Sequence, residues 1–177
     1  SQIDNTIAWY ENDGNANPSW TASDIATSAA SAYSVFAADM DNDGDMDVLS
    51  ASYGDDTIAW YENTATFSFD PTWTASDITT SASGAMSVFA ADIDGDGDMD
   101  IISASKLDDT IAWYENSGGP FWSASTITTN ADGAFSVFAA DMDNDGDMDV
   151  LSASDIDDTI AWYENDGAAN PSWTASD

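Results

Sequence analysis

Aspartate residues gather in three nine-residue segments of this chain, where they occupy alternate positions. The segments begin at Asp39, Asp92 and Asp141, and carboxylates fall at positions 1, 3, 5, 7 and 9 of each. A glycine at position 6 permits the sharp turn that brings the last carboxylate back towards the first. Calcium prefers such ligands, since this hard cation takes roughly 6 to 8 oxygens at about 2.3–2.6 Å. The candidate ligands are Asp39, Asp41, Asp43, Asp45, Asp47, Asp92, Asp94, Asp96, Asp98, Asp100, Asp141, Asp143, Asp145, Asp147 and Asp149.

Other interpretations of these loops explain them less well. The calcium loop of an EF-hand lies between two helices and carries a bidentate glutamate at position 12. In this chain position 12 is Ser50, Ser103 or Ser152. A solvated turn would leave five carboxylates within nine residues repelling one another without a cation. Magnesium demands near-octahedral geometry and keeps its waters. The sequence therefore predicts three calcium ions, one for each loop.

The balance of charge excludes several classes of partner. Of the 177 residues, 34 are acidic and one is basic, Lys106, which gives a formal net charge of -33. Such a surface repels phosphate backbones and anionic lipid head groups, so we expect no nucleic-acid partner. We also expect no membrane insertion, because no apolar run approaches the roughly 18 residues of a membrane-spanning helix. Cations among the carboxylates would relieve the self-repulsion of a compact fold.

The residue types that are absent narrow the chemistry further. The chain has no cysteine and no histidine, so disulfides and thiolate or imidazole metal sites are excluded, and oxygen ligands remain. Few groups are left that could serve as nucleophile or general base, and we therefore expect no enzyme activity. A hydrophobic content of 43% with 8 Trp indicates a chain that folds despite its charge.

Two further sequence motifs recur together with the loops and define a repeat. Ser-Val-Phe-Ala-Ala-Asp occurs three times and leads into each loop. Thr-Ile-Ala-Trp-Tyr-Glu-Asn occurs four times, with successive copies 51, 53 and 49 residues apart. Repeats of about 50 residues are typical of β-propeller blades. The copies of the second motif begin at Thr6, Thr57, Thr110 and Thr159.

Each repeat indicates four β-strands, with the aspartate loop between the first two. In the first full repeat, Ser-Val-Phe-Ala-Ala and Asp-Val-Leu-Ser-Ala-Ser flank the loop, and residues 57–62 and 73–78 follow as a third and a weaker fourth strand. On the third strand Ile58 and Trp60 lie on one face and Tyr61 on the other, so neither face is polar. Two buried faces are expected where sheets stack radially, as in a propeller.

We therefore predict an all-β fold of β-propeller-type tandem four-stranded blades, with about three and a half blades in this chain. The predicted divisions are a half blade of strands three and four over residues 1–24, and blades over residues 34–78, 87–127 and 136–177, together one repeat array. Propellers close with about four to eight blades. We expect either that other copies complete a ring or that the chain is an excerpt from a longer array.

These motifs resemble the FG-GAP and VCBS-type repeats of integrin-α-like propellers, which occur widely in large secreted bacterial proteins. The resemblance covers essentially the whole chain and is carried by Phe-Ala-Ala-Asp-x-Asp-x-Asp-Gly-Asp-x-Asp, a small-residue strand and Thr-Ile-Ala-Trp-Tyr-Glu-Asn. It implies a calcium ion held by the side chains at loop positions 1, 3, 5 and 9 and by the main-chain carbonyl at position 7. In the first loop these residues are Asp39, Asp41, Asp43 and Asp47, with the carbonyl of Asp45.

The resemblance also implies a secreted or cell-surface protein, for which two functions stay open. In the first, calcium-stabilised repeats have a structural and adhesive role and assemble with other copies into a closed propeller or a filament. In the second, the repeats form a recognition propeller, a lectin or adhesin module that binds glycans or extracellular proteins through loops on one rim. The incomplete blade count and the near-identical repeats favour the structural role.

Overall fold

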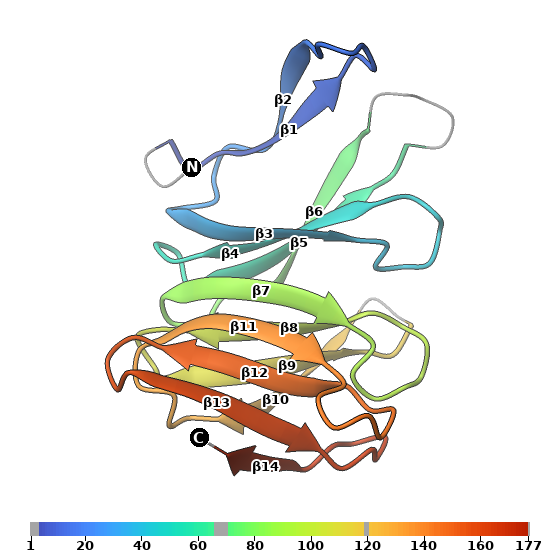
Figure 1. Ribbon diagram of the computed structural model, residues 1–177. Helices are drawn as coiled ribbons and strands as arrows, with labels where there is room; N and C mark the ends of the chain where they lie inside the picture. The colour runs from blue at the N-terminus through green and yellow to red at the C-terminus, as the bar shows by residue number, and fades with distance from the viewer. Residues whose placement is uncertain (1–3, 66–70, 119–120, 177) are drawn as a thin grey trace.

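The computed structural model describes residues 4–65, 71–118 and 121–176, and every regular element within them is a β-strand (Figure 1). The prediction of an all-β fold is confirmed. No helix among the described residues is long and apolar enough to cross a membrane. In chain order the strands are β1 (Ile7–Asn12), β2 (Trp20–Ala26), β3 (Ala32–Ala38), β4 (Asp47–Ser52), β5 (Thr57–Asn63), β6 (Trp73–Thr79), β7 (Ala85–Ala91), β8 (Asp100–Ser105), β9 (Thr110–Asn116), β10 (Trp122–Thr128), β11 (Ala134–Ala140), β12 (Asp149–Ser154), β13 (Thr159–Asn165) and β14 (Trp173–Ser176).

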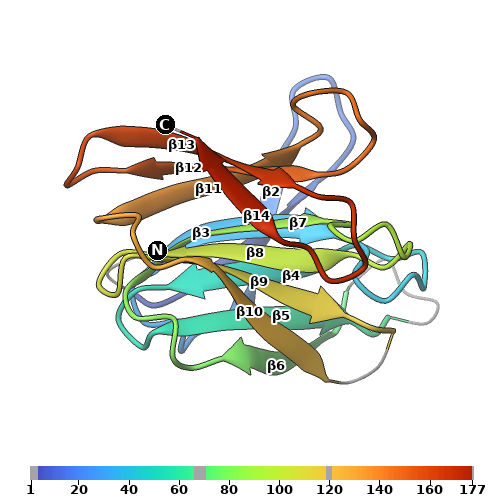
Figure 2. The same ribbon diagram turned by 90° about the horizontal axis from the view of Figure 1, so that it is seen from below.

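These strands form three four-stranded antiparallel sheets and one two-stranded sheet. The sheets β3–β6, β7–β10 and β11–β14 each follow chain order, so every strand pairs with its neighbour in sequence. The hairpin β1–β2 corresponds to the third and fourth strands of the repeat. Tandem antiparallel sheets of four strands are the arrangement predicted for propeller-type blades. In Figure 1 the sheets follow one another as layers, from β1–β2 at one end to β11–β14 at the other, and Figure 2 shows the same sheets from below.

The four-stranded sheets pack face to face because both of their faces are apolar. Each has a front face, which bears the isoleucine of Thr-Ile-Ala-Trp-Tyr-Glu-Asn, and a back face, which bears the tyrosine of that motif. Ile58 on the front face of β3–β6 shares a core with Val88 and Tyr114 on the back face of β7–β10. In the same way Ile111 on the next front face shares a core with Val137 on the back face of β11–β14. Front-on-back packing is therefore the interface that the repeat uses throughout.

The first strands of the three sheets lie side by side along the inner edge of the layers. Strands β3, β7 and β11 contact one another in turn, and each carries the phenylalanine of Ser-Val-Phe-Ala-Ala. The ring centroids of Phe36 and Phe89 are 4.6 Å apart, and those of Phe89 and Phe138 are 4.7 Å apart. Tilted aromatic pairs at such distances are favourable beyond the area that they bury. The row of rings aligns successive sheets along this edge.

A buried asparagine joins each pair of neighbouring four-stranded sheets across their interface. The Nδ2 group of Asn116, at the end of β9, donates a hydrogen bond of 2.9 Å to the main-chain carbonyl of Met40 in the preceding sheet's loop. Asn165, at the end of β13, donates an equivalent bond of 2.9 Å to the carbonyl of Ile93. Because these bonds are buried, they fix the register of one sheet on the next as well as satisfying the two carbonyls.

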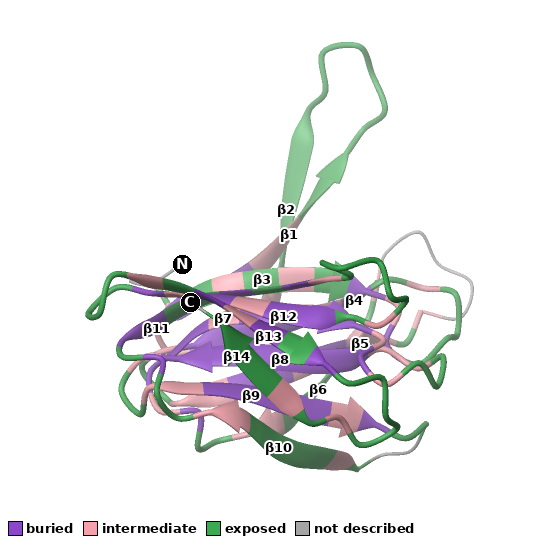
Figure 3. Cartoon of the chain, turned by 60° about the horizontal axis from the view of Figure 1, so that its bottom comes forward, coloured by how far each residue is buried: buried purple, intermediate pink, exposed green. Residues whose placement is uncertain are grey.

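The hairpin β1–β2 is attached to the rest of the chain mainly at its base. Ile7 is buried and shares a small core with Ala59 and Tyr61 on the back face of β3–β6. Further along the hairpin, Tyr10 and Trp20 are each 59% exposed. Figure 3 shows the outer part of the hairpin projecting from the layered sheets, with its residues in the exposed class.

Shortening Ile58 to alanine tests the front-on-back core. The side chain is fully buried between two sheets, so Ile58→Ala leaves a cavity and should lower the free energy of unfolding by about 2–5 kcal/mol. Ile156 provides a matched control, because it is 60% exposed in the turn before β13. Ile156→Ala should change the free energy of unfolding by no more than about 0.5 kcal/mol in urea denaturation. Equal losses in the two variants would contradict the assigned core.

Candidate metal centre

Each aspartate loop connects the first two strands of a four-stranded sheet. The first loop leaves β3 after Ala38 and enters β4 at Asp47, and the loops between β7 and β8 and between β11 and β12 are equivalent. Because β3, β7 and β11 run side by side in the same direction, the three loops lie on the same side of the molecule (Figure 1). The sheets therefore present one candidate site per repeat along a single edge.

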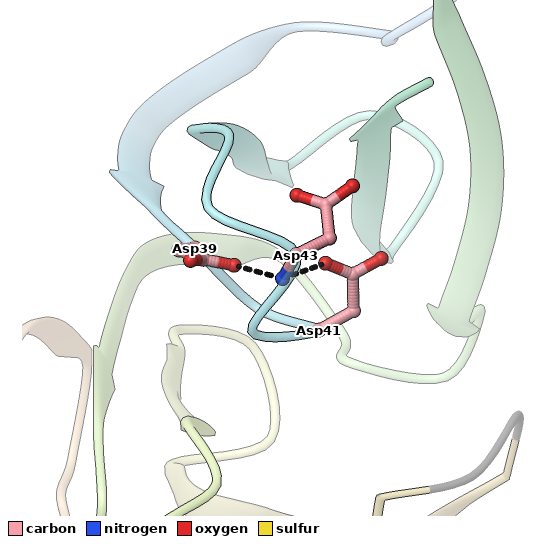
Figure 4. Close-up of side chains that lie close together, drawn as sticks. All are labelled: Asp39, Asp41 and Asp43. Atoms are coloured by element: carbon pink, nitrogen blue, oxygen red, sulfur yellow. Dashed lines mark hydrogen bonds between the residues drawn. The ribbon is translucent and has the colours of Figure 1, made fainter. Parts of the chain in front are cut away.

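The first three aspartates of each loop come together as a triad. Carboxylate oxygens of Asp39, Asp41 and Asp43 lie within 4.8 Å of one another, which is close enough for one metal ion to contact all three (Figure 4). The other two triads meet the same criterion. Carboxylates at positions 1, 3 and 5 are thus positioned to hold a metal ion, as the sequence predicts. The other two triads are Asp92, Asp94 and Asp96, and Asp141, Asp143 and Asp145.

Backbone N–H groups of the loop hold these carboxylates in place. The N–H of Asp43 donates to the Oδ1 atoms of Asp39 and Asp41, both at 3.2 Å, as Figure 4 shows. The N–H of Gly44 donates to Oδ2 of Asp39 at 3.0 Å, and that of Asp45 donates to Oδ1 of Asp43 at 2.9 Å. These bonds curl the backbone around the carboxylates. Carboxylates held in this way lose little conformational freedom when an ion binds, which favours affinity.

The glycine at position 6 adopts a backbone conformation that other residues rarely reach. Gly44, Gly97 and Gly146 have φ of 97°, 99° and 104°. In each case the N–H of this glycine donates to Oδ2 of the position 1 aspartate, at 3.1 Å for Asp92 and 3.2 Å for Asp141. A side chain at this φ would be strained, so the turn that closes the triad depends on glycine.

The last aspartate of each loop lies beneath the loop rather than in the triad. Asp47 is 1% exposed, its Oδ2 accepts the N–H of Met40 at 3.0 Å, and its Oδ1 accepts the N–H of Asn63 at 2.8 Å. Both carboxylate oxygens therefore bind backbone, one group in the loop and one at the end of β5. Each oxygen keeps a second lone pair for a further contact. The equivalent residues, Asp100 and Asp149, make the same pairs of bonds.

The aspartates at position 7 also lie outside the triads. Asp98 accepts a hydrogen bond of 3.1 Å from Nδ2 of Asn42, which belongs to the loop of the preceding sheet. This side chain thus links two neighbouring loops. The resemblance described above assigns only the main-chain carbonyl of this position to the metal, which leaves the carboxylate available for such contacts. The other two members of the set are Asp45 and Asp147.

Burial and neighbouring charges oppose the ionisation of some loop carboxylates. Burial raises the pKa of Asp41, and the neighbouring carboxylates of Asp43 and Asp39 raise it further. Burial also raises the pKa of Asp100 to about 6, although the backbone N–H groups of Asn116 and Ile93 act to lower it. Carboxylates that are costly to ionise together gain most from a shared divalent cation.

The raised pKa of Asp100 gives a pH dependence that can be measured on the metal-free protein. Native Asp100 keeps its proton to about pH 6, whereas the aspartate in the unfolded chain loses it near 3.8, so the native state binds more protons between these values. The free energy of unfolding should therefore fall as pH rises through this window. In chelator, the urea midpoint should be higher at about pH 5 than at about pH 7, and the difference should shrink in Asp100→Asn. A midpoint that rises with pH would contradict the burial of this carboxyl.

One recurring residue, the asparagine that ends Thr-Ile-Ala-Trp-Tyr-Glu-Asn, has two roles that the sequence analysis does not predict. The asparagine that ends Thr-Ile-Ala-Trp-Tyr-Glu-Asn donates its backbone N–H to the position 9 aspartate, as Asn116 does to Asp100 at 2.8 Å. Its side chain donates to the position 2 carbonyl of the preceding loop, as Asn116 does to Met40. The sequence feature that could have indicated these roles is the recurrence of this asparagine at the end of the third strand of each repeat.

Comparison with protein families agrees with this geometry. The model of the FG-GAP-like repeat matches the chain three times, over residues 1–50, 39–103 and 93–152. The matched residues run continuously from 1 to 152 and contain all three aspartate loops. A search of curated proteins finds no match.

Proposed function

We propose, since this chain belongs to the FG-GAP-like repeat family, that it is a calcium-stabilised extracellular repeat protein with a structural and adhesive role. Its sheets form the framework, and one calcium ion at each aspartate loop stabilises that framework. In the first loop the ion is held by Asp39, Asp41 and Asp43, with the carbonyl of Asp45 and a lone pair of Asp47 as further ligands.

The observation that carries this proposal is the recurrence of the same carboxylate triad once per four-stranded sheet. A ligand needed for recognition or catalysis is usually bound at a single site, whereas a cation that supports every repeat recurs with the repeat. Three divalent cations would bring six positive charges to loops that contain fifteen carboxylates. They would relieve the repulsion that otherwise acts within each turn.

Several features support calcium as the ion and a structural role for the protein. The triads offer only hard oxygen ligands, and further oxygens of the same loop lie nearby, which suits the higher coordination number of calcium better than the stricter octahedral geometry of magnesium. Calcium modules outside the cell work at about 10⁻⁴–10⁻³ M, so a modest site is sufficient there. The one basic side chain, Lys106, pairs with Asp155 and lies 5.5 Å from the ring centroid of Phe135. It bridges two sheets, which supports a structural protein rather than an enzyme.

One feature favours the alternative function, a glycan-binding or protein-binding module. A groove of about 460 Å³ lies between β5–β6 and β10, beside the first loop. Trp60 and Trp122 line it, with ring centroids 6.3 Å apart, together with the carboxylates of Glu62 and Asp77. Aromatic walls with polar groups around them suit a sugar ring. Binding of one glycan class on an array, lost in Trp122→Ala, would favour this alternative over the structural role.

Removal of calcium tests the stabilising role directly. A ligand present at about 100 times its dissociation constant stabilises the folded state by about 2.7 kcal/mol per site. For a chain of this length, even one site then corresponds to a rise of roughly 5–10 °C in Tm. Calorimetry in calcium and then in excess chelator should therefore show a clear drop in Tm. An unchanged Tm in chelator would rule out a stabilising metal.

A pair of isosteric variants separates ligation from simple loss of charge. Asp43→Asn and Asp45→Asn each remove one negative charge from the same loop, but only Asp43 belongs to the triad. Isothermal titration with calcium should show one of three sites weakened by at least about tenfold in Asp43→Asn, a loss of about 1.4 kcal/mol. Asp45→Asn should retain three sites of nearly unchanged affinity. Equal weakening in both variants would show that the loop attracts cations only by its charge.

A further inference from the structure

The third strand of each four-stranded sheet buries an indole N–H group that has no hydrogen-bond acceptor. The Nε1 atoms of Trp60, Trp113 and Trp162 are buried, and none of them has a hydrogen-bond partner among the described residues. The whole side chain of Trp113 is only 1% exposed. A buried donor without an acceptor destabilises a fold, yet this one recurs at the same position of every four-stranded sheet. Such recurrence indicates a role that each repeat requires.

The register of the strands places this indole on the same face of the sheet as the buried aspartate at loop position 9. Trp113 on β9 lies opposite Ile102 on β8, and cross-strand partners share a face. Asp100 precedes Ile102 by two residues, so it lies on that face too, diagonal to Trp113. Diagonal neighbours are about 7–8 Å apart along the backbone, a distance that an aromatic side chain can span. The other two four-stranded sheets have the same register.

The indole lies close enough to act on this carboxyl group. Burial raises the pKa of Asp100, two backbone N–H groups act to lower it, and the side chain of Trp113 acts in the same direction as those groups. Burial also raises the pKa of Asp47, and there the side chain of Trp60 acts to lower it. A donor lowers the pKa of a carboxyl because it stabilises the charged form. In these two repeats the indole N–H therefore lies beside the carboxyl without completing a hydrogen bond to it.

The carboxylate at position 9 gains from a third donor if it is to serve as a metal ligand. Oδ1 of Asp100 accepts the N–H of Asn116 at 2.8 Å, and Oδ2 accepts the N–H of Ile93 at 3.1 Å. A ligating carboxylate must be ionised, and hydrogen-bond partners hold it in one orientation. Two or three N–H donors can keep even a buried carboxyl charged. The unused indole N–H is the group that would complete this set.

We propose that Trp60, Trp113 and Trp162 are positioning residues of the three metal sites, and that each indole N–H donates to the position 9 carboxylate of its own loop when that loop holds calcium. The indole does not contact the ion. It orients the carboxylate and supports its negative charge, and the loss of such a partner typically weakens metal binding by about 10–100-fold. This inference deepens the proposed calcium sites and rests on them.

Nuclear magnetic resonance of the indole N–H groups tests the proposal on the wild-type chain. The 8 Trp give separate ¹H–¹⁵N cross-peaks, which Trp→Phe variants assign one by one. Calcium should move the indole protons of Trp60, Trp113 and Trp162 downfield, because a proton that gains a carboxylate acceptor is deshielded. Trp20 is 59% exposed on β2, so its cross-peak should stay in place and serve as the reference. Cross-peaks of the three buried indoles that stay in place while calorimetry shows calcium binding overturn the proposal.

A sulfur isostere of tryptophan separates the hydrogen bond from the packing of the ring. Replacement of Trp113 by β-(3-benzothienyl)alanine removes the N–H and keeps the shape of the side chain. Isothermal titration should show one of three calcium sites weakened by about 10–100-fold, with the other two unchanged. The Tm in chelator should stay close to that of wild type, because the packing of the ring is retained. The same isostere at Trp20 is the control and should retain all three sites.

Two outcomes separate this proposal from the calcium sites on which it rests. Three sites of wild-type affinity in the Trp113 isostere refute the positioning role and leave the calcium sites standing. A wild-type chain that binds no calcium in the titration refutes the calcium sites, and the positioning role with them. A purely structural role for Trp113 would lower the Tm of Trp113→Phe equally in calcium and in chelator. The positioning role instead predicts a larger loss in calcium than in chelator.

Discussion

The buried carboxylate at the end of each aspartate loop is the contact on which the rest of the repeat depends. Through Asp47 the loop and the third strand are joined, since one oxygen accepts the N–H of Met40 and the other the N–H of Asn63. This bond pair sets where the loop stands over the sheet, and hence where the triad of Asp39, Asp41 and Asp43 comes together. It also places the carbonyl of Met40 so that the next sheet's asparagine can reach it. The candidate metal site, the sheet and the contact between sheets therefore all depend on this buried carboxylate.

A repeat built in this way carries an inherent conflict between charge and compactness. The loops concentrate carboxylates along one side of the layers, while the sheets beneath them are held by nonpolar faces and a row of phenylalanine rings. Repulsion in the loops acts against the same compact state that the apolar faces favour. A cation shared by the carboxylates of each loop, as proposed above, would relieve this repulsion at the place where it arises. The carboxylates lie in the loops and the apolar packing surfaces lie on the sheets, so the sheets stack without burying most of the loop charge.

Much of the fold and of the candidate site could be predicted from the sequence, because strands and metal-binding loops both depend on the spacing of residues close together in the chain. Alternation along Thr-Ile-Ala-Trp-Tyr-Glu-Asn indicated strands with two apolar faces, and the spacing of Asp39, Asp41 and Asp43 indicated a shared cation. Two properties could not be predicted. The hydrogen bonds of Asp47 need a partner sixteen residues away, in Asn63, which pattern alone does not supply. Ile58 and Ile160 stand in identical motifs yet differ in burial, because burial depends on which sheet comes next rather than on the local sequence.

The presence of a single basic residue among these 177 limits the susceptibility of the chain to proteases that cut after lysine or arginine. An enzyme that cuts after lysine or arginine finds a single candidate bond here, after Lys106. That residue lies in the turn between β8 and β9, its backbone N–H is bonded to the carbonyl of Gly84, and its ammonium group is paired with Asp155 of the next sheet. Cleavage needs a segment that can leave its hydrogen bonds and enter an active site. A trypsin-like enzyme can therefore cut these 177 residues only after Lys106, and it must first displace the side chain of Lys106 from Asp155.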